Sequence, residues 1–154
     1  DSPITLRMAI PAGLQNPERS LIYRRDSAKN RWVRQATSTK GGQATAEVRQ
    51  LGKYALMIDD SAPKVEVLRI AKGQTLDTVR PAIRVRAVDE GSGVESWRVT
   101  YNGKWLLTEY DPEQDLLTWE RDEDLPAGPG TLLIEVRDHA GNLSRREIGI
   151  SMPM

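Results

Sequence analysis

Apolar and polar residues alternate with a period of two along most of this chain, and helical periodicity is hard to find. Residues 4–10 alternate in this way and stop at Pro11 and Gly13, as a strand does when it enters a turn. Other short stretches follow, each bounded by glycine, proline, asparagine or aspartate. In the first part of the chain we expect strands at residues 4–10, 21–24, 31–34, 44–48 and 52–58.

The second part repeats this pattern more regularly. Residues 82–88 and 131–137 alternate as half-buried strands do. Asn102-Gly103 predicts a tight hairpin, because a type I′ turn needs positive φ at both central residues. We expect seven strands at residues 64–70, 82–88, 94–101, 104–109, 116–120, 131–137 and 144–150, which is typical of an immunoglobulin-like sandwich.

A polar junction that ends in a proline separates the two parts at Asp59-Asp60-Ser61-Ala62-Pro63. Proline cannot donate a hydrogen bond to a sheet, so a domain boundary fits here. The sequence therefore predicts an all-β protein of two small β-sandwich modules. Residues 1–60 form a small sandwich or barrel, and residues 63–152 form an immunoglobulin-like or fibronectin-III-like sandwich of about seven strands.

Composition and charge exclude several kinds of chemistry. The chain has no cysteine, which excludes disulfides, thiolate metal sites and cysteine nucleophiles. The 22 basic and 22 acidic residues cancel, so net charge does not favour a nucleic acid or an anionic membrane. No apolar run approaches the roughly 18 residues of a membrane-spanning helix. A local basic cluster is interpreted as a solvated face: Arg24, Arg25, Lys29, Arg31 and Arg34.

The residues that could carry catalysis or bind a metal all fall in predicted turns. His139 is the only histidine, and neither a zinc site nor a serine triad can be built from one histidine without partners. Asp138, Gly141 and Asn142 are expected to be structural turn residues, as are Asn102 and Gly103. A calcium site is the alternative for one end of the sandwich, with an incomplete set of ligands: Asp89, Glu90, Asp138 and Asn142.

Carboxylates between residues 111 and 124, including Asp122, lie in hydrophilic turns. A glycosidase needs two carboxyl groups that face each other across a cleft, with one desolvated. Solvated surface groups are the simpler interpretation. We therefore expect no catalytic residue, no cofactor and no enzymatic activity in this chain.

Aromatic residues are the remaining candidates for a ligand-binding site. Trp97 and Tyr101 share one strand face by parity. Trp105, Leu107 and Glu109 share one face of the next predicted strand, and Tyr110 follows that strand. An aromatic strip that stacks on a sugar is therefore one hypothesis. Core packing or a contact between modules is the other, because tryptophan and tyrosine often serve as large, partly buried anchors.

Four stretches of the second module together resemble a known kind of protein: residues 88–97, 102–111, 125–128 and 136–144. They resemble the immunoglobulin-like C-terminal region of Bacteroidetes envelope proteins, notably those with an N-terminal lysostaphin-type zinc metallopeptidase domain. In the first module, residues 51–56 and 60–63 are similar to the segment that precedes this region. The peptidase needs paired histidine motifs, so no catalytic residue carries over to a chain with one histidine.

The resemblance implies a periplasmic or cell-surface location and an accessory role. We expect a non-catalytic interaction module of a bacterial envelope protein, which positions a peptidase domain or binds a protein partner. The alternative is a carbohydrate- or peptidoglycan-binding module that uses exposed Trp and Tyr side chains. A nucleic-acid partner and a membrane span are not expected.

Overall fold

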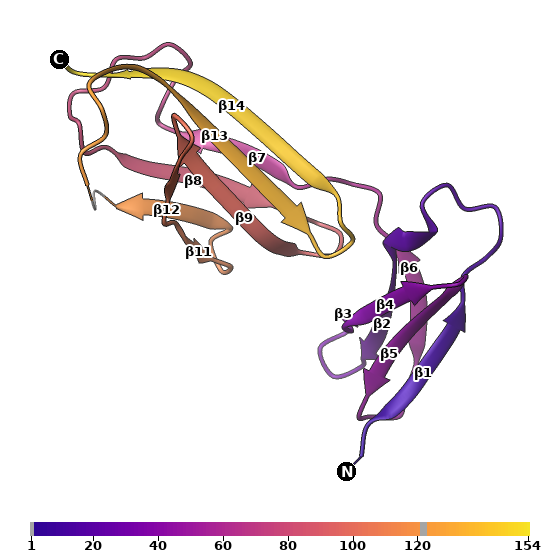
Figure 1. The fold of residues 1–154 in the computed structure, drawn as a ribbon. Coiled ribbons are helices and arrows are strands. Elements are labelled where there is room, and N and C mark those ends of the chain that lie inside the picture. The colour runs from indigo at the N-terminus through magenta and orange to yellow at the C-terminus, as the bar shows by residue number, and fades with distance from the viewer. Residues whose placement is uncertain (1, 121–122) are drawn as a thin grey trace. The chain divides into compact units, whose positions relative to one another are not determined.

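A computed structural model of the chain describes residues 2–120 and 123–154 (Figure 1). Asp122 of the acidic stretch lies outside the described residues. The chain divides into two compact units, Asp1–Ser61 and Ala62–Met154, which we call module 1 and module 2. The described residues contain one short 3-10 helix and otherwise strands and turns. Among them, no helix is both long and apolar enough to cross a membrane.

Module 1 is formed by two three-stranded antiparallel sheets, with strand orders β1-β5-β4 and β3-β2-β6. The 3-10 helix η1 (Pro17–Arg19) leads into β2. The strands are β1 (Ile4–Ala9), β2 (Ser20–Asp26), β3 (Arg31–Arg34), β4 (Thr37–Lys40), β5 (Gln43–Val48) and β6 (Tyr54–Ile58).

The core cluster of module 1 is small, and two of its four buried residues are alanines. Ile22 of β2 packs with Ala44, Ala46 and Val48 of β5, and partly buried residues such as Leu56 surround them. Since side chains alternate along a strand, the residues of β2 that share the parity of Ile22 face the interior. Arg24 is one of them.

Module 2 is formed by two four-stranded antiparallel sheets, with strand orders β10-β9-β13-β14 and β11-β12-β8-β7. This division of strands between two sheets is the immunoglobulin-like arrangement. The strands are β7 (Lys64–Leu68), β8 (Ala82–Val88), β9 (Val94–Tyr101), β10 (Lys104–Leu106), β11 (Glu109–Asp111), β12 (Leu116–Glu120), β13 (Gly128–Asp138) and β14 (Leu143–Met152).

The core of module 2 is much larger. Trp119 and Tyr101 are each 1% exposed, and Ile83, Leu117 and Ile134 are fully buried. Each such side chain contributes roughly 1.5–3 kcal/mol by leaving water. Inward and outward residues alternate along β8 and β13, as the sequence predicts. The all-β fold class is therefore confirmed.

Two strand predictions are wrong in detail. β4 is not predicted, because Thr37–Lys40 contains no apolar residue and lies at the edge of its sheet. The single strand predicted at residues 104–109 is two strands, β10 in one sheet and β11 in the other. Leu107 and Thr108 carry the chain from one sheet to the other, so module 2 has eight strands rather than seven.

Candidate interaction surface

Three of the four predicted aromatic residues face the core of module 2, and two of these three, Tyr101 and Trp97, lie on the same strand β9. Tyr101 is 1% exposed, and its ring covers the backbone of Gly130 on the neighbouring strand β13. Trp97 is partly buried and packs against the same core. Its indole Nε1 donates a hydrogen bond to the Thr108 carbonyl at 3.2 Å. Both rings are therefore parts of the packed interior.

Tyr110 is also turned inward. Its ring centroid lies 5.2 Å from that of Trp97, with the planes tilted by 46°, a geometry that aromatic pairs favour. Its hydroxyl lies 3.4 Å from both the Ala87 carbonyl and Asp115 Oδ1. Burial raises the pKa of the Tyr110 hydroxyl, and the Asp115 carboxylate raises it further. Tyr110 thus stabilises the fold at the β11 edge.

Trp105 points the other way and is 54% exposed. It pairs across β10 and β9 with Thr100, not with Tyr101. Paired residues of antiparallel strands lie on the same face, so Trp105 lies on the outer face while Trp97 and Tyr101 lie on the inner one. The four predicted aromatic residues therefore do not form one strip, because Trp97 and Tyr101 lie on the inner face of their sheet, Trp105 lies on its outer face and Tyr110 lies on β11 of the other sheet.

Strand register builds a row of side chains around Trp105 on this outer face. Thr100 pairs with Leu133, and Leu133 pairs in turn with Glu147. Beyond the end of β10, Leu107 is 62% exposed. We call Trp105, Leu133 and Leu107 the Trp105 surface, while Thr100 in the same row is only 6% exposed. A charged row, Arg98, Glu135 and Arg145, runs beside it.

A shallow hollow of about 570 Å³ adjoins the Trp105 surface at Leu107 and lies along β11 and β12. Leu107 and Leu116 supply its apolar lining, and Glu109, Asp111 and Glu120 are its acidic residues. The backbone amide of Glu113 and the side-chain amide of Gln114 lower the pKa of Asp111 by hydrogen bonding. The exposed edge is therefore apolar with a carboxylate rim.

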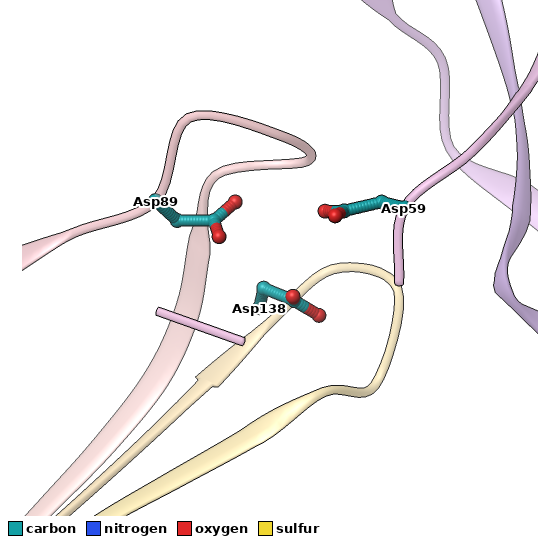
Figure 2. A group of neighbouring side chains, drawn as sticks. All are labelled: Asp59, Asp89 and Asp138. Atoms are coloured by element: carbon teal, nitrogen blue, oxygen red, sulfur yellow. The ribbon is translucent and has the colours of Figure 1, made fainter. Parts of the chain in front are cut away.

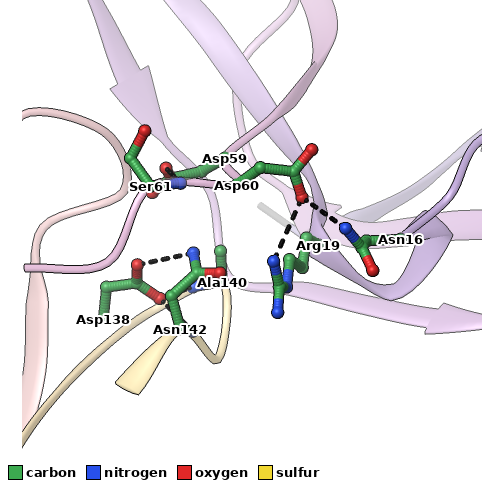
Figure 3. Close-up of polar contacts among 8 residues, drawn as sticks. All are labelled: Asn16, Arg19, Asp59, Asp60, Ser61, Asp138, Ala140 and Asn142. Carbon is green, nitrogen blue, oxygen red and sulfur yellow. Dashed lines mark hydrogen bonds and ion pairs between the residues drawn. The ribbon is translucent and has the colours of Figure 1, made fainter. Parts of the chain in front are cut away.

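The predicted structural turn at Asp138 is held by a network of hydrogen bonds (Figure 3). Asp138 is fully buried. One of its oxygens accepts from the amides of Ala140 at 2.9 Å and Asn142 at 2.8 Å, and the other accepts from Asn142 Nδ2 at 2.8 Å. Gly141 has a φ of +90°, which only glycine adopts readily.

The calcium hypothesis concerned this end of module 2. Figure 2 shows the carboxylates of Asp89 and Asp138 on neighbouring loops, with oxygens within 4.8 Å of each other. Asp89 accepts the Gly93 amide at 2.7 Å, and Glu90 pairs with Lys64 at 3.6 Å. Of the four proposed ligands, Asp89, Asp138 and Asn142 thus come together within the described residues, whereas Glu90 is not part of their group. His139 is half-buried, with Nδ1 lying 3.8 Å from a Glu95 oxygen.

The Asn102-Gly103 turn has the predicted conformation, with φ of 47° and 78°. Asn102 Oδ1 also accepts the Thr131 amide at 2.8 Å, which ties the hairpin to β13. The length of this turn also determines which face of the sheet Trp105 occupies, and the aromatic hypothesis did not take it into account. A two-residue loop pairs Tyr101 with Lys104, and it therefore places Trp105 on the face opposite to Tyr101.

Comparisons with known proteins support the fold alone. Neither a family model nor a curated protein sequence matches the chain. An endo-beta-1,4-mannanase from Thermotoga petrophila is similar to 61% of this chain at 12% identity and a TM-score of 0.51, and the match covers 20% of the mannanase. The fibronectin(III)-like modules of Clostridium thermocellum CbhA match 99% of this chain and 86% of their own, at 10% identity and a TM-score of 0.48. CopC from Methylosinus trichosporium OB3b matches 54% of this chain and 85% of its own, at 15% identity and a TM-score of 0.42. With two antiparallel sheets in each module, the protein is a β-sandwich protein.

Proposed function

We propose that this chain is a non-catalytic accessory part of a bacterial envelope protein and that the Trp105 surface binds a protein partner. The observation that carries the proposal is the exposure of two large apolar side chains, Trp105 at 54% and Leu107 at 62%, at one edge of module 2. Tryptophan is enriched among the residues that dominate binding energy at protein interfaces. The two side chains expose this apolar area beside polar groups, as interaction sites do.

The edge of the sandwich also supports a protein partner. β10 and β11 are the outer strands of their two sheets, so each has one side without a neighbouring strand. Such edges accept an added strand or segment through backbone hydrogen bonds. The carboxylates of Glu109, Asp111 and Glu120 beside Leu107 favour a partner segment with basic and apolar residues.

The envelope location rests on the resemblance of residues 88–97, 102–111 and 136–144 to envelope proteins. In that setting the partner is the peptidase domain of the same polypeptide or a separate envelope protein. A sugar platform is a weaker hypothesis, since Trp105 is the only one of its four predicted aromatic residues that is exposed.

The proposal is tested by photo-crosslinking. A benzophenone amino acid is placed at position 105 of the protein in its own host, and in a control at Leu143, which is 47% exposed on the same sheet. We expect position 105 alone to give a protein adduct with one defined peptide, identified by mass spectrometry. Equal yields from both positions, or no protein adduct, would refute the proposal.

A second measurement addresses the sugar hypothesis. The purified chain is sedimented with peptidoglycan and with insoluble β-glucans, as wild type and as Trp105→Ala. We expect no saturable binding of the wild type. Saturable binding that Trp105→Ala abolishes would replace the protein partner by a glycan.

A further inference from the structure

The net charge of zero is the sum of opposite net charges on the two modules. Residues 1–61 contain ten basic residues (Lys and Arg) and six acidic residues (Asp and Glu). Residues 62–154 contain twelve basic and sixteen acidic residues. The formal charges are therefore +4 and −4. The expectation that charge favours no anionic ligand holds for the whole chain but not for module 1 by itself.

The charges of module 1 are also divided along its length. Asp60 lies at the end where η1 and β6 meet and contacts Arg19 and Asn16, at 3.3 Å and 3.0 Å (Figure 3). The opposite end holds the β2–β3 hairpin and the β5–β6 turn, which are joined by a hydrogen bond from the Arg25 amide to the Lys53 carbonyl at 2.9 Å. Seven cations gather there with Asp26 and Glu47: Arg24, Arg25, Lys29, Arg31, Arg34, Arg49 and Lys53.

A cleft of about 410 Å³ opens at this basic end and is lined by residues from both sheets of module 1. Arg24, Arg34 and Arg49 line it, and Glu47 is the one acidic residue in its lining. Val33 and Val48 supply apolar walls. The size is within the range of small-molecule sites, and the lining carries a net charge of +2.

Arg24 is the unusual member of this set. It pairs with Val33 and Tyr54 and has the parity of the core residue Ile22, so its side chain faces the space between the sheets. Arg24 is a half-buried residue, and within the described part of the chain its guanidinium makes no hydrogen bond or ion pair. The neighbouring Arg25, in contrast, contacts Asn30 and lies over the Trp32 ring at 5.5 Å.

An arginine that faces the interior is costly to the extent that its guanidinium leaves water, unless an acceptor reaches it. Arginine presents a planar fork of donors that matches the oxygens of a phosphate. Three arginines and a net charge of +2 fit a doubly charged group better than a single carboxylate. The cleft is larger than one phosphate, and its valine walls suit a small organic body.

We infer that the cleft of module 1 binds a phosphate monoester carried by a small organic molecule, of the class of a sugar phosphate. The cleft lies in module 1 and is independent of the Trp105 surface of module 2. It needs no reaction and no metal. Arg24 contacts the phosphate from the interior side, and Arg34 and Arg49 contact it from the rim.

The test is a titration of the full chain with glucose 1-phosphate, followed by isothermal calorimetry and by NMR of the arginine Nε–H groups. We expect saturable binding that Arg24→Gln weakens by about tenfold or more, as loss of a charged hydrogen bond does. Arg49→Gln, in an exposed turn, should weaken it as well. Arg31→Gln is the matched control, because Arg31 is exposed at the same end but does not line the cleft.

Three further probes separate the sources of affinity. Glucose should not bind, and glucuronate, with one negative charge, should bind about tenfold more weakly than glucose 1-phosphate. Equal affinity for glucuronate would overturn the assignment of a phosphate. Tighter binding of a short DNA duplex, or an equal loss of affinity in Arg31→Gln, would show diffuse attraction by the basic end and overturn the site. Absence of binding by all probes would overturn it too.

Discussion

Gly130 is the position at which the packing of module 2 can be tested most sharply. A Cβ atom added there would lie 2.0 Å from the Tyr101 hydroxyl oxygen and 2.2 Å from Cζ of the same ring. An ordinary contact needs about 3.4 Å, so the ring would have to withdraw by about 1.4 Å. Tyr101 is 1% exposed in a close-packed core, and such a core resists displacement.

We expect Gly130→Ala to lower the free energy of unfolding of module 2 by about 2 kcal/mol, within the usual cost of overpacking. For a unit of this size, that corresponds to a fall of about 8–16 °C in its melting temperature. Gly149→Ala is the matched control on the adjacent strand β14, because its Cβ would meet nothing within 4 Å. It should be neutral or stabilise by about 0.5–1 kcal/mol, since alanine has less freedom than glycine in the unfolded chain.

The measurement is urea unfolding of both variants, followed by tryptophan fluorescence. A double variant, Gly130→Ala with Tyr101→Leu, should be more stable than the sum of the two single losses predicts, because the smaller side chain makes room for the methyl group. Equal stability of the Gly130 and Gly149 variants would refute the packing of Tyr101 over β13.

Three other predictions concern local contacts in module 2. Asp138→Ala should destabilise it by about 3 kcal/mol or more in urea unfolding, because two amides and Asn142 Nδ2 lose a charged acceptor; an unchanged midpoint would contradict this role. Burial, and then the nearby carboxylates, raise the pKa of Tyr110 in the folded protein. Tyr110 therefore contributes its full stabilisation below about pH 10, the ordinary pKa of tyrosine. This stabilisation is lost as the pH rises through the pKa of the folded state. Tyr110→Phe should therefore flatten the alkaline fall in melting temperature, and an unaltered profile would argue against it. Asn102→Ala should lower the free energy of unfolding by about 1–2 kcal/mol, because it removes the acceptor of the Thr131 amide and places alanine at positive φ. An equal loss of stability in Lys104→Ala would show that the turn does not need asparagine.

Alternation of polarity predicts most strands of this fold because both modules bury one face of each sheet. It could not predict β4, where Thr37–Lys40 forms a polar edge strand. Nor could it show that the chain changes sheets at Leu107, since residues 104–109 contain no glycine or proline that would mark a break between two strands. That crossing is a property of three-dimensional pairing and leaves little trace in local polarity.

The site was less predictable than the fold. Parity within β9 places Trp97 and Tyr101 together, and the structure agrees. The face of Trp105 depends on the register across the hairpin, which the two-residue Asn102-Gly103 turn specifies. The cleft in module 1 needs Arg24 to be recognised as an inward position, and the sequence shows only a basic cluster. The other residues that line the cleft, on β5 and the β5–β6 turn, are distant from Arg24 along the chain.

The unequal cores of the modules have a consequence for how the chain responds to heat. The buried core cluster of module 1 is only Ile22, Val48 and two alanines, so its melting transition should come well below that of module 2, whose core includes the buried Trp119. Between the two transitions, the chain would be a folded sandwich with an unstructured tether. A compound that occupies the arginine cleft would raise only the lower transition, and a calorimetric scan would then report which module it has bound.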